Sequence, residues 1–268
     1  SGPSSRNTSA VCAPLSGDGA SGVAAALNRT AGPARQNRGM PSCGDSTDAA
    51  VVQRLMGDGR AALFATDPPY LVDYDGTNHP QAWNAPESKK RVMNKDWSET
   101  YKDWDAAEQG AALYEGFVGA AVAHAIREDA AWYCWHASRR QAMLEGVWEK
   151  FGAFVHQQII WNKDRPVLTR SFYMWQHEPC FYGWVRPHKP PRVVDEFLST
   201  VWSFPTQTAF EKTDHPTQKP LQLFEIPMRM HTRPGELCYE PFSGSWRPRI
   251  WGGNAERWSW RRLLWRWR

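Results

Sequence analysis

The sequence lacks a long apolar run, and this absence excludes a membrane-spanning helix. No stretch of about 18 consecutive apolar residues, the length that such a helix needs, occurs among the 268 residues. The N-terminus carries no basic segment followed by an apolar one, so nothing predicts export. A hydrophobic fraction of 41% and a mean hydropathy of −0.62 are typical of a soluble globular protein. The length suffices for one large α/β domain or two small ones.

Cysteine is scarce, and its spacing argues against two kinds of stabilising site. The five cysteines are far apart and form no C-x-x-C pair. This argues against a disulfide framework or a structural zinc site and favours a reducing cytoplasm. The histidines also lack the spacing of metal ligands, so we expect no metal. The residues concerned are Cys12, Cys43, Cys134, Cys180, Cys238, His136, His156, His177, His188 and His215.

Positive charge is absent from most of the chain, although the formal net charge is +4. Residues 246–268 contain seven arginines and one glutamate, a net charge of +6, so the other 245 residues carry −2. Any binding of nucleic acid must therefore depend on local chemistry, because the overall charge of the body does not favour it.

Strand-like and helix-like segments alternate through the middle of the chain. Short apolar runs are typical of buried strands, and alanine-rich or amphipathic segments at helical spacing lie between them. This alternation predicts an α/β fold, with a parallel sheet and helices on its faces. The predicted strands are residues 61–66, 130–136, 154–163 and 236–242, and the predicted helices are residues 105–126, 141–152 and 220–231.

Four segments do not fit this alternation. Residues 1–40 are rich in Ser, Gly, Ala, Arg and Pro, which indicates a disordered or remnant arm. Residues 73–104 are polar and turn-rich, and residues 186–214 are Pro-rich and irregular. Residues 246–268 contain six Trp and seven Arg with no strand or helix period. This tail is either a shifted reading frame of GC-rich DNA or a basic segment that binds a polyanion.

The sharpest local motif is Asp67-Pro68-Pro69-Tyr70, at the end of a predicted strand. Proline has no N–H and a fixed φ, so a Pro-Pro step is a stiff turn whose carbonyls have few local partners. A carboxylate beside such a carbonyl can accept both protons of an exocyclic amine, and Tyr70 offers a flat face for a heterocycle. This would expose the nitrogen lone pair for attack on an electrophilic methyl group. The structural alternative is an Asx-type turn after a strand.

Two further motifs are weaker. Residues 215–220 (HPTQKP) precede a helix, and residues 239–245 (YEPFSGS) end a strand in a Gly-bearing turn, where a nucleotide-like cofactor can lie against backbone. Lys219 could pair there with a cofactor carboxylate, although ordinary helix and strand ends explain both segments too. Upstream, Asp45 could accept a hydrogen bond from an adenine amino group, or could be the N-cap of a following helix.

Together these motifs have a recognisable order. They resemble those of the amino-DNA methyltransferases, in the permuted β-type order of bacterial and phage modification enzymes, with the catalytic motif ahead of the cofactor motif. The similarity covers residues from about Pro41 to Ser245. The motifs are Gly44-Asp45-Ser46, Asp67-Pro68-Pro69-Tyr70, His215-Pro216-Thr217-Gln218-Lys219-Pro220 and Glu240-Pro241-Phe242-Ser243-Gly244-Ser245, with Trp161-Asn162-Lys163 and Gln176-His177-Glu178-Pro179 also fitting.

The resemblance implies a circularly permuted Rossmann-like fold that uses S-adenosylmethionine and acts on double-stranded DNA, in the context of restriction-modification. The target base would be flipped out of the duplex. Because the tetrapeptide begins with Asp, it implies methylation of adenine N6; cytosine-N4 enzymes more often begin with Ser. Methylation of RNA or of a protein amide is a further alternative, but the motif order argues against protein-glutamine enzymes. The resemblance requires no metal or membrane and leaves a homodimer open.

The resemblance also implies site residues. Asp67 and the Pro68 carbonyl would hold the amino group, with Pro69 and Tyr70 completing the catalytic set and Tyr70 stacking on the base. Cofactor contacts would come from Asp45 at the adenine end, Lys219 at the methionine carboxylate, and Phe242, Ser243 and Gly244 along the cofactor. The substrate side would add His215 and the phosphate contacts Arg165, Arg170 and Arg186, for which exposed solubilising charges are the alternative.

The implied organisation is an arm at 1–40, a catalytic domain at 41–245 and an atypical tail at 246–268, with 186–214 as a short target-recognition segment. Residues 73–104 are also candidates for DNA contact. The tryptophans Trp132, Trp135, Trp161 and Trp175 are expected in the core or in a substrate wall.

The chain departs from the family pattern at its cofactor end. Trp246 stands where the family has the second glycine of Phe-x-Gly-x-Gly, and a side chain there would fill space that a cofactor needs. Only Glu256 is available as the acidic residue for the ribose hydroxyls. The fold is therefore expected to be incomplete at its C-terminal end, and an inactive DNA-binding remnant is the alternative to an enzyme.

Overall fold

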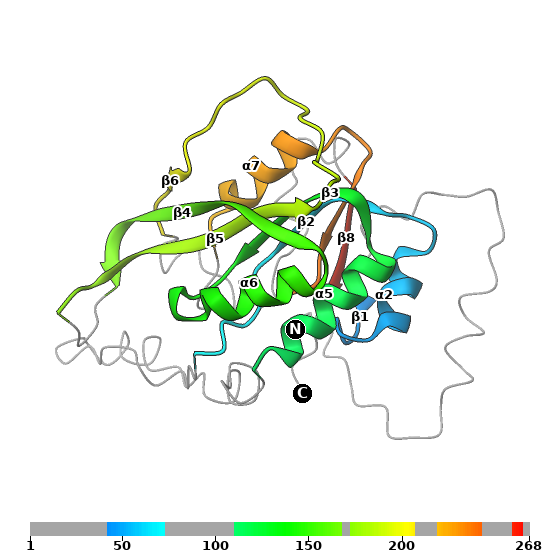
Figure 1. The fold of residues 1–268 in the computed structure, drawn as a ribbon. Helices are drawn as coiled ribbons and strands as arrows, with labels where there is room; N and C mark the ends of the chain where they lie inside the picture. Colours follow the sequence, from blue (N-terminus) through cyan, green and yellow to red (C-terminus); the bar gives the residue numbers. More distant parts are fainter. Residues whose placement is uncertain (1–41, 73–109, 168–171, 207–218, 243–258, 265–268) are drawn as a thin grey trace, which may run out of the picture. The chain divides into compact units, whose positions relative to one another are not determined.

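The computed structural model describes residues 42–72, 110–167, 172–206, 219–242 and 259–264, which all belong to the unit Arg38–Arg268. These residues form one eight-stranded sheet with helices packed on it (Figure 1). The strands are β1 (Ser42–Cys43), β2 (Ala61–Thr66), β3 (Ile126–Trp135), β4 (Ala153–Val167), β5 (Trp175–Val185), β6 (Val201–Ser203), β7 (Leu237–Glu240) and β8 (Ser259–Leu264). The helices are α2 (Ala49–Met56), α5 (Ala112–His124), the short 3-10 helix η2 (Ser138–Arg140), α6 (Gln141–Lys150) and α7 (Gln222–His231).

The strand order places a switch point in the middle of the sheet. The order is β1-β8-β7-β2-β3-β5-β4-β6, so the chain continues from β2 to β3 on one side and from β7 to β8 on the other. In open α/β sheets, ligands bind outside the carboxyl ends of the strands at such a reversal. The carboxyl ends of β2 and β7 are therefore the expected site.

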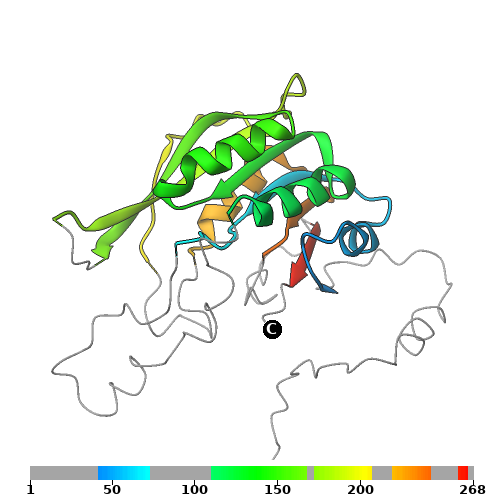
Figure 2. The ribbon, with the colours of Figure 1, turned by 60° about the horizontal axis from the view of Figure 1, so that its bottom comes forward.

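The sheet is mixed, and in this respect the predicted parallel sheet is wrong. β5 runs antiparallel to both of its neighbours, β3 and β4, whereas the other pairs are parallel. Only residues 168–174 separate β4 from β5. A parallel crossover needs about a dozen residues or more, so this short connection permits only a hairpin. The β4–β5 hairpin extends past the helices in both Figure 1 and Figure 2.

Two apolar cores cover opposite faces of the sheet. Successive residues of a strand point to opposite faces, so Phe64 packs with the core beneath α2, α5 and α6, whereas Leu63 and Ala65 pack with the core beneath α7. Every residue of β2 is buried, as expected of a central strand covered on both faces. This burial fixes the starting point of the tetrapeptide that follows β2.

Most predicted elements are confirmed. The strand at residues 61–66 is β2, the strand at 236–242 contains β7, and the helices at 141–152 and 220–231 contain α6 and α7. Residues 176–179, which fit the family pattern, lie inside β5. Trp132, Trp135 and Trp161 are buried as predicted. Trp175 is half exposed, because it lies on the part of the hairpin that extends past the core.

The tail contains a strand that the sequence does not predict. Residues Ser259–Leu264 form β8, which pairs in parallel with β7 on one side and with β1 on the other. The sequence shows no strand period there, but backbone pairing to two neighbours does not require one. Within the described part of the chain, no helix is long and apolar enough to cross a membrane, and no cluster of three or more His, Cys, Asp or Glu side chains could hold a metal ion.

Candidate active site at the carboxyl edge of the sheet

The tetrapeptide leaves β2 at the switch point and is anchored from two helices. Tyr114 of α5 donates a hydrogen bond from Oη to the Pro69 carbonyl at 2.7 Å. Leu71 is buried with φ at 54°, a left-handed conformation that is unusual for leucine. Arg140, which precedes α6, donates from Nε to the Leu71 carbonyl at 2.8 Å. The backbone after Asp67 is therefore fixed by contacts from outside its own loop.

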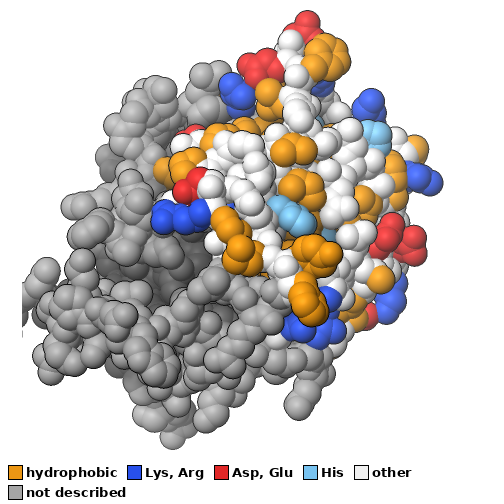
Figure 3. All heavy atoms as spheres, turned by 90° about the vertical axis from the view of Figure 1, so that its left-hand side faces the viewer, with side chains coloured by type: hydrophobic (Ala, Val, Ile, Leu, Met, Phe, Trp, Pro, Cys, Tyr) orange, Lys and Arg blue, Asp and Glu red, His pale blue; other side chains and the backbone are white. Residues whose placement is uncertain are grey.

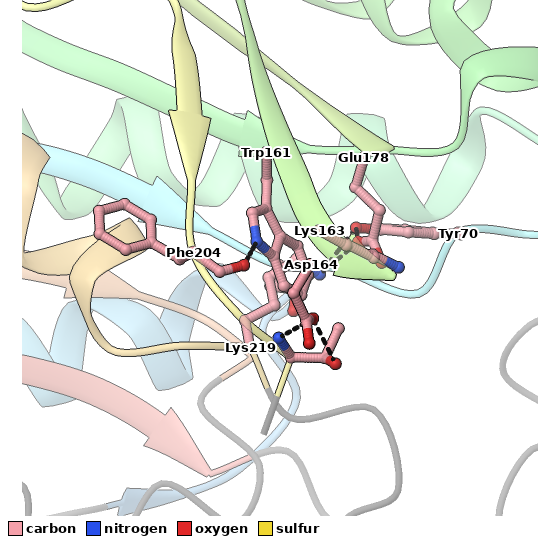
Figure 4. Close-up of polar contacts among 9 residues, drawn as sticks. Tyr70, Trp161, Lys163, Asp164, Glu178, Phe204 and Lys219 are labelled. Atoms are coloured by element: carbon pink, nitrogen blue, oxygen red, sulfur yellow. Dashed lines mark hydrogen bonds and ion pairs between the residues drawn. The ribbon is translucent and has the colours of Figure 1, made fainter. Parts of the chain in front are cut away.

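An ion network contacts the first and last residues of the tetrapeptide, and Figure 4 shows Tyr70 with Lys163, Glu178 and Lys219. Lys219 Nζ lies 2.6 Å from Asp67 Oδ1 and 3.1 Å from Glu178 Oε2, and it donates to Tyr70 Oη at 2.8 Å. Tyr70 in turn donates to Glu178 Oε2 at 2.9 Å. Lys163 completes the network, with its Nζ 2.6 Å from Glu178 Oε1. Two ammonium groups thus balance two carboxylates around one phenol.

Burial and charge act in opposite directions on this network. Burial by itself would raise the pKa of Glu178, but Lys219 and Lys163 outweigh it and lower that pKa to about 2. Burial would lower the pKa of Lys219, but Asp67 and Glu178 raise it above its ordinary value. Burial, followed by Asp67 and Glu178, raises the pKa of Tyr70 well above its ordinary value. At neutral pH Glu178 and Lys219 are therefore charged, and the Tyr70 phenol is neutral.

The β4–β5 hairpin delivers two of these residues. Lys163 is near the end of β4 and Glu178 near the start of β5, so both lie at the edge of the sheet where β2 ends. Gln176 Nε2 donates to the Lys163 carbonyl at 3.0 Å, and the Trp161 indole donates to the Phe204 carbonyl at 2.8 Å (Figure 4). The position of β4 near Lys163 is therefore fixed by hydrogen bonds from β5 and to the segment after β6.

The end of β7 carries a second buried acidic group. Glu240 Oε1 accepts hydrogen bonds from Thr66 Oγ1 at 3.1 Å and from the Phe242 N–H at 2.6 Å. Burial raises the pKa of Glu240 well above its ordinary value. Its Oε2 and the Ser46 Oγ after β1 are buried without a hydrogen-bond partner among the described residues. Buried polar atoms are normally paired, so the unpartnered Glu240 Oε2 at the end of β7 and Ser46 Oγ after β1 fit a site for a polar ligand.

Asp45 does not cap a helix, so the structural alternative for this residue is wrong. The N-cap of α2 is Asp48, whose side chain accepts from the backbone N–H groups of Ala50 and Val51. Asp45 is exposed and accepts from the N–H and the hydroxyl of Thr47, at 2.8 and 2.7 Å. Asp48 is the N-cap because it immediately precedes the first residue of α2. The contact of Asp45 with an adenine stays a prediction.

The structure brings together only some of the other predicted residues. Lys219 lies three residues before α7 and reaches Asp67 and Glu178, whereas the sequence predicts a cofactor carboxylate as its partner. Arg165 is exposed at the same edge, with Nε 3.3 Å from Asp164 Oδ2. Arg186 follows the far end of β5 and stacks on Phe154, so it lies at the opposite edge of the sheet. His215, Arg170, Ser243, Gly244, Trp246 and Glu256 lie outside the described residues.

Sequence reasoning missed three charged residues of this site. Glu178 and Lys163 belong to segments that fit the family pattern, but the sequence assigns neither of them a function. Glu240 belongs to the predicted cofactor motif, which likewise assigns it no function of its own. One signal could have found them: each is a charged residue within or beside a run of apolar and aromatic residues. Charged groups in such surroundings are rarely buried unless they are paired.

Comparisons with known proteins agree with this architecture and motif order. The family model described as DNA methylase, which covers N6 and N4 methyltransferases, matches residues 61–247. The type II methyltransferase M2.MboI of Moraxella bovis is 26% identical in an alignment over 203 residues that covers 70% of this chain and 70% of that protein. Among solved structures, the M1.HpyAVI–SAM complex has a TM-score of 0.53 at 18% identity, covering 85% of this chain and 93% of that one. PvuII DNA methyltransferase, described as cytosine-N4-specific, has a TM-score of 0.57 at 12% identity, covering 85% and 82%.

The fold and the arrangement of motifs are those of methyltransferases that use S-adenosylmethionine. This chain belongs to the N6/N4 DNA methylase family, whose members methylate an amino group of adenine or of cytosine. The resemblance drawn from the motifs and the Rossmann-like fold are thereby confirmed. The two solved structures support the fold alone, because their sequence identities are low.

Proposed function

We propose that this chain transfers a methyl group from S-adenosylmethionine to the N6 amino group of adenine in double-stranded DNA. The observation that carries the proposal is the position of Asp67, which follows central strand β2 at the switch point and is held by Lys219 at 2.6 Å. The aspartate at the first position of the tetrapeptide supports adenine N6 over cytosine N4, because the resemblance links that form to adenine enzymes.

Asp67 and the Pro68 carbonyl would accept the two N–H bonds of the target amino group. A carboxylate offers about four lone-pair sites, so an ion pair with Lys219 is compatible with this role. Polarisation of both N–H bonds raises the electron density of the nitrogen lone pair that attacks the methyl group. The carboxylate then stabilises the positive charge that develops on the nitrogen.

Tyr70 would hold the flipped base by stacking. Its hydroxyl donates to Glu178 and accepts from Lys219, so the ring is oriented before any base arrives. A preoriented ring loses little rotational freedom when a base stacks on it, which leaves more of the stacking free energy for binding. In this scheme Lys219 and Glu178 are positioning residues, because they act through Asp67 and Tyr70.

The residues around the ends of β1 and β7 would hold S-adenosylmethionine. Asp45 and Phe242 are proposed contacts, together with Ser243 and Gly244, and the unpartnered Ser46 Oγ and Glu240 Oε2 fit a polar ligand. When bound, the cofactor supplies an electrophilic methyl group on a sulfonium, so no metal is needed. The chain contributes the alignment of the amine with that methyl group, and alignment dominates a simple displacement.

The test is an analysis of modified nucleosides. The purified chain would be incubated with methyl-labelled S-adenosylmethionine and unmethylated duplex DNA, and the DNA then digested to nucleosides. We expect label in N6-methyladenine. Label in N4-methylcytosine would contradict the choice of base but not the family. An absence of transfer by a chain that binds S-adenosylmethionine and DNA would contradict the proposed activity and favour the inactive remnant.

A further inference from the structure

The tip of the β4–β5 hairpin exposes an unusual group of apolar side chains. We define the hairpin tip as Val167 together with Phe172, Tyr173, Met174 and Trp175. Phe172 is fully exposed and Tyr173 is 86% exposed, and the other three are about half exposed. These five account for most of the nine exposed large hydrophobic side chains in the described ranges. A soluble protein rarely leaves such a group in water unless it binds something.

The hairpin tip is connected directly to the active site. β4 carries Lys163 and β5 carries Glu178, and both strands continue past these residues to the tip. At about 3.3 Å per residue of a strand, Trp175 lies about 10 Å beyond Glu178 along β5, and Phe172 precedes Trp175 by three residues. β4 is antiparallel to β5, and β5 is antiparallel to β3, which is parallel to β2. The tip therefore projects past the same edge at which Asp67 lies (Figures 1 and 2).

The surroundings of the tip suit a nucleic acid better than an apolar protein core. Arg165 of β4 is exposed between the active site and the tip. Figure 3 views the molecule from the side toward which the hairpin projects in Figure 1, and it shows hydrophobic side chains on that face with both basic and acidic side chains near them. The major groove of B-DNA, about 12 Å wide, admits a two-stranded β-ribbon. A hairpin two strands wide therefore has suitable dimensions.

Base flipping leaves unstacked bases in the duplex next to the active site. When a base leaves the duplex, its neighbours lose a stacking partner and the gap is open to water. Apolar side chains such as Phe and Met are the types that proteins insert between base steps. The hairpin tip offers these side chains past the same edge of the sheet at which Asp67 lies.

We propose that the hairpin tip is a wedge that inserts into duplex DNA beside the target base, with Phe172 and Tyr173 packing against the bases that lose a stacking partner. This inference rests on the proposed function, because it assumes that the target comes from a duplex. The tip acts on the opening of the duplex and takes no part in the transfer of the methyl group.

The test compares duplex with single-stranded substrate, because a single strand needs no opening. The double variant Phe172→Ala/Tyr173→Ala would be assayed with S-adenosylmethionine on unmethylated plasmid DNA and on the same DNA after heat denaturation. We expect kcat/KM on duplex to fall about tenfold or more, in line with the loss of one or two stacking contacts. Activity on single strands should change little, so the ratio of duplex to single-strand activity should fall by the same factor.

Two controls make this result specific. Tyr173→Phe keeps the ring and should keep the ratio. Val122→Ala removes part of an exposed apolar side chain from α5 and should also leave it unchanged. Because Phe172 and Tyr173 are exposed, the double variant should stay folded at the assay temperature, which thermal melting would verify.

If the double variant is active and its ratio of duplex to single-strand activity equals that of the wild type, the wedge proposal is wrong. A change of oligomeric state in sedimentation, with the ratio unaffected, would assign the tip to self-association instead. If the wild-type chain transfers no methyl group, the proposed function fails separately. The wedge would then be judged from binding of fluorescent duplex and single strands, where it still predicts a selective loss of duplex affinity.

Discussion

At the residue scale, the structure gives each charged group of the ion network around Tyr70 an opposite charge within about one hydrogen-bond length. Lys219 is the centre of this arrangement, since it contacts Asp67, Tyr70 and Glu178 at once. Its ammonium group is therefore fully engaged by the protein. A lysine that binds a cofactor carboxylate would instead have a free donor. We therefore propose that Lys219 orients the catalytic tetrapeptide.

The role of Asp67 leads to the first prediction. Asp67→Ala should lower methyl transfer by about 10²-fold or more, the effect of removing one preorganised electrostatic contact to a transition state. The affinity for S-adenosylmethionine should stay nearly unchanged, because the cofactor is proposed to lie against β1 and β7. Single-turnover transfer and calorimetric titration would measure the two quantities. Asp58→Ala, at an exposed position before β2, is the matched control; wild-type turnover by Asp67→Ala would refute the assignment.

A second prediction concerns the stability of the ion network. Glu178→Gln leaves Lys163 and Lys219, which are nearly buried, with one carboxylate fewer. Breaking a buried pair by removing one partner costs about 3–5 kcal/mol, whereas an exposed pair contributes about 0–1 kcal/mol. Glu115→Gln, which removes the partner of Lys150 at the surface, is therefore the control. Equal free energies of unfolding for the two variants in urea would show that the network is not effectively buried.

Sequence reasoning could find Asp67, Tyr70 and Lys219 because each belongs to a short motif with local chemistry. It could not find that Lys219 binds Asp67, since 152 residues separate them. The contact exists only because the segment before α7 and the end of β2 meet at the switch point. The pairing of Lys163 with Glu178 likewise depends on the β4–β5 register, which a sequence does not display.

At the element scale, the β4–β5 hairpin depends on one close approach. A Cβ at Gly183 of β5 would lie 1.9 Å from the Phe154 carbonyl oxygen and 3.0 Å from the Trp148 ring. Opposite Gly183 the register shifts between Val155 and Gln157, so the two strands pass around an extra residue there. Glycine permits this approach, which is one of the recognised uses of glycine inside a strand.

A third prediction follows from this contact. Gly183→Ala should lower the free energy of unfolding by several kcal/mol, because the backbone of β4 must move away. Gly146→Ala should instead raise it by about 0.5–1 kcal/mol, since a Cβ at Gly146 of α6 meets nothing within 4 Å and alanine favours a helix. Thermal and urea unfolding of both variants would test the pair. A stable Gly183→Ala protein would contradict the close packing of the hairpin.

The elements differ in how well the sequence predicts them. β2 is correctly placed because a central strand buried on both faces leaves a continuous apolar run, and α6 because an amphipathic helix leaves a helical period. The antiparallel direction of β5 could have been inferred from the short connection at 168–174. β8 could not, because its place depends on the exposed edges of β1 and β7 and not on its own pattern.

At the scale of the whole molecule, two buried histidines make stability depend on pH. Burial lowers the pKa of His136 and of His231 from 6.5 to about 4. Below pH 6.5 the unfolded chain binds these protons, whereas the folded chain does not until about pH 4. The folded state is thus favoured fully above pH 6.5 and loses stability as the pH falls from 6.5 to 4.

The fourth prediction is the size of this loss. Each histidine should cost about 1.4 kcal/mol per pH unit in this window. Between pH 6.5 and 5.5 the free energy of unfolding in urea should therefore fall by roughly 2–3 kcal/mol. Glu178 adds no loss in that window, because its lowered pKa affects stability only below its unfolded value. His231→Gln, which can still hydrogen-bond Tyr133, should remove about half of the pH dependence; an unaltered dependence would disprove it.

The position of β8 also dictates an order of events during synthesis. Cys43 of β1 pairs with Leu264 of β8, and β8 separates β1 from β7. A ribosome adds about 5–20 residues per second, so on the order of ten seconds or more pass between the synthesis of β1 and that of β8. Among the described residues, β8 is the strand with which β1 pairs. Until residues 259–264 have left the ribosome, β7 keeps an unpaired edge that can recruit another chain. The nascent protein is thus expected to expose this edge of β7 until residues 259–264 have emerged.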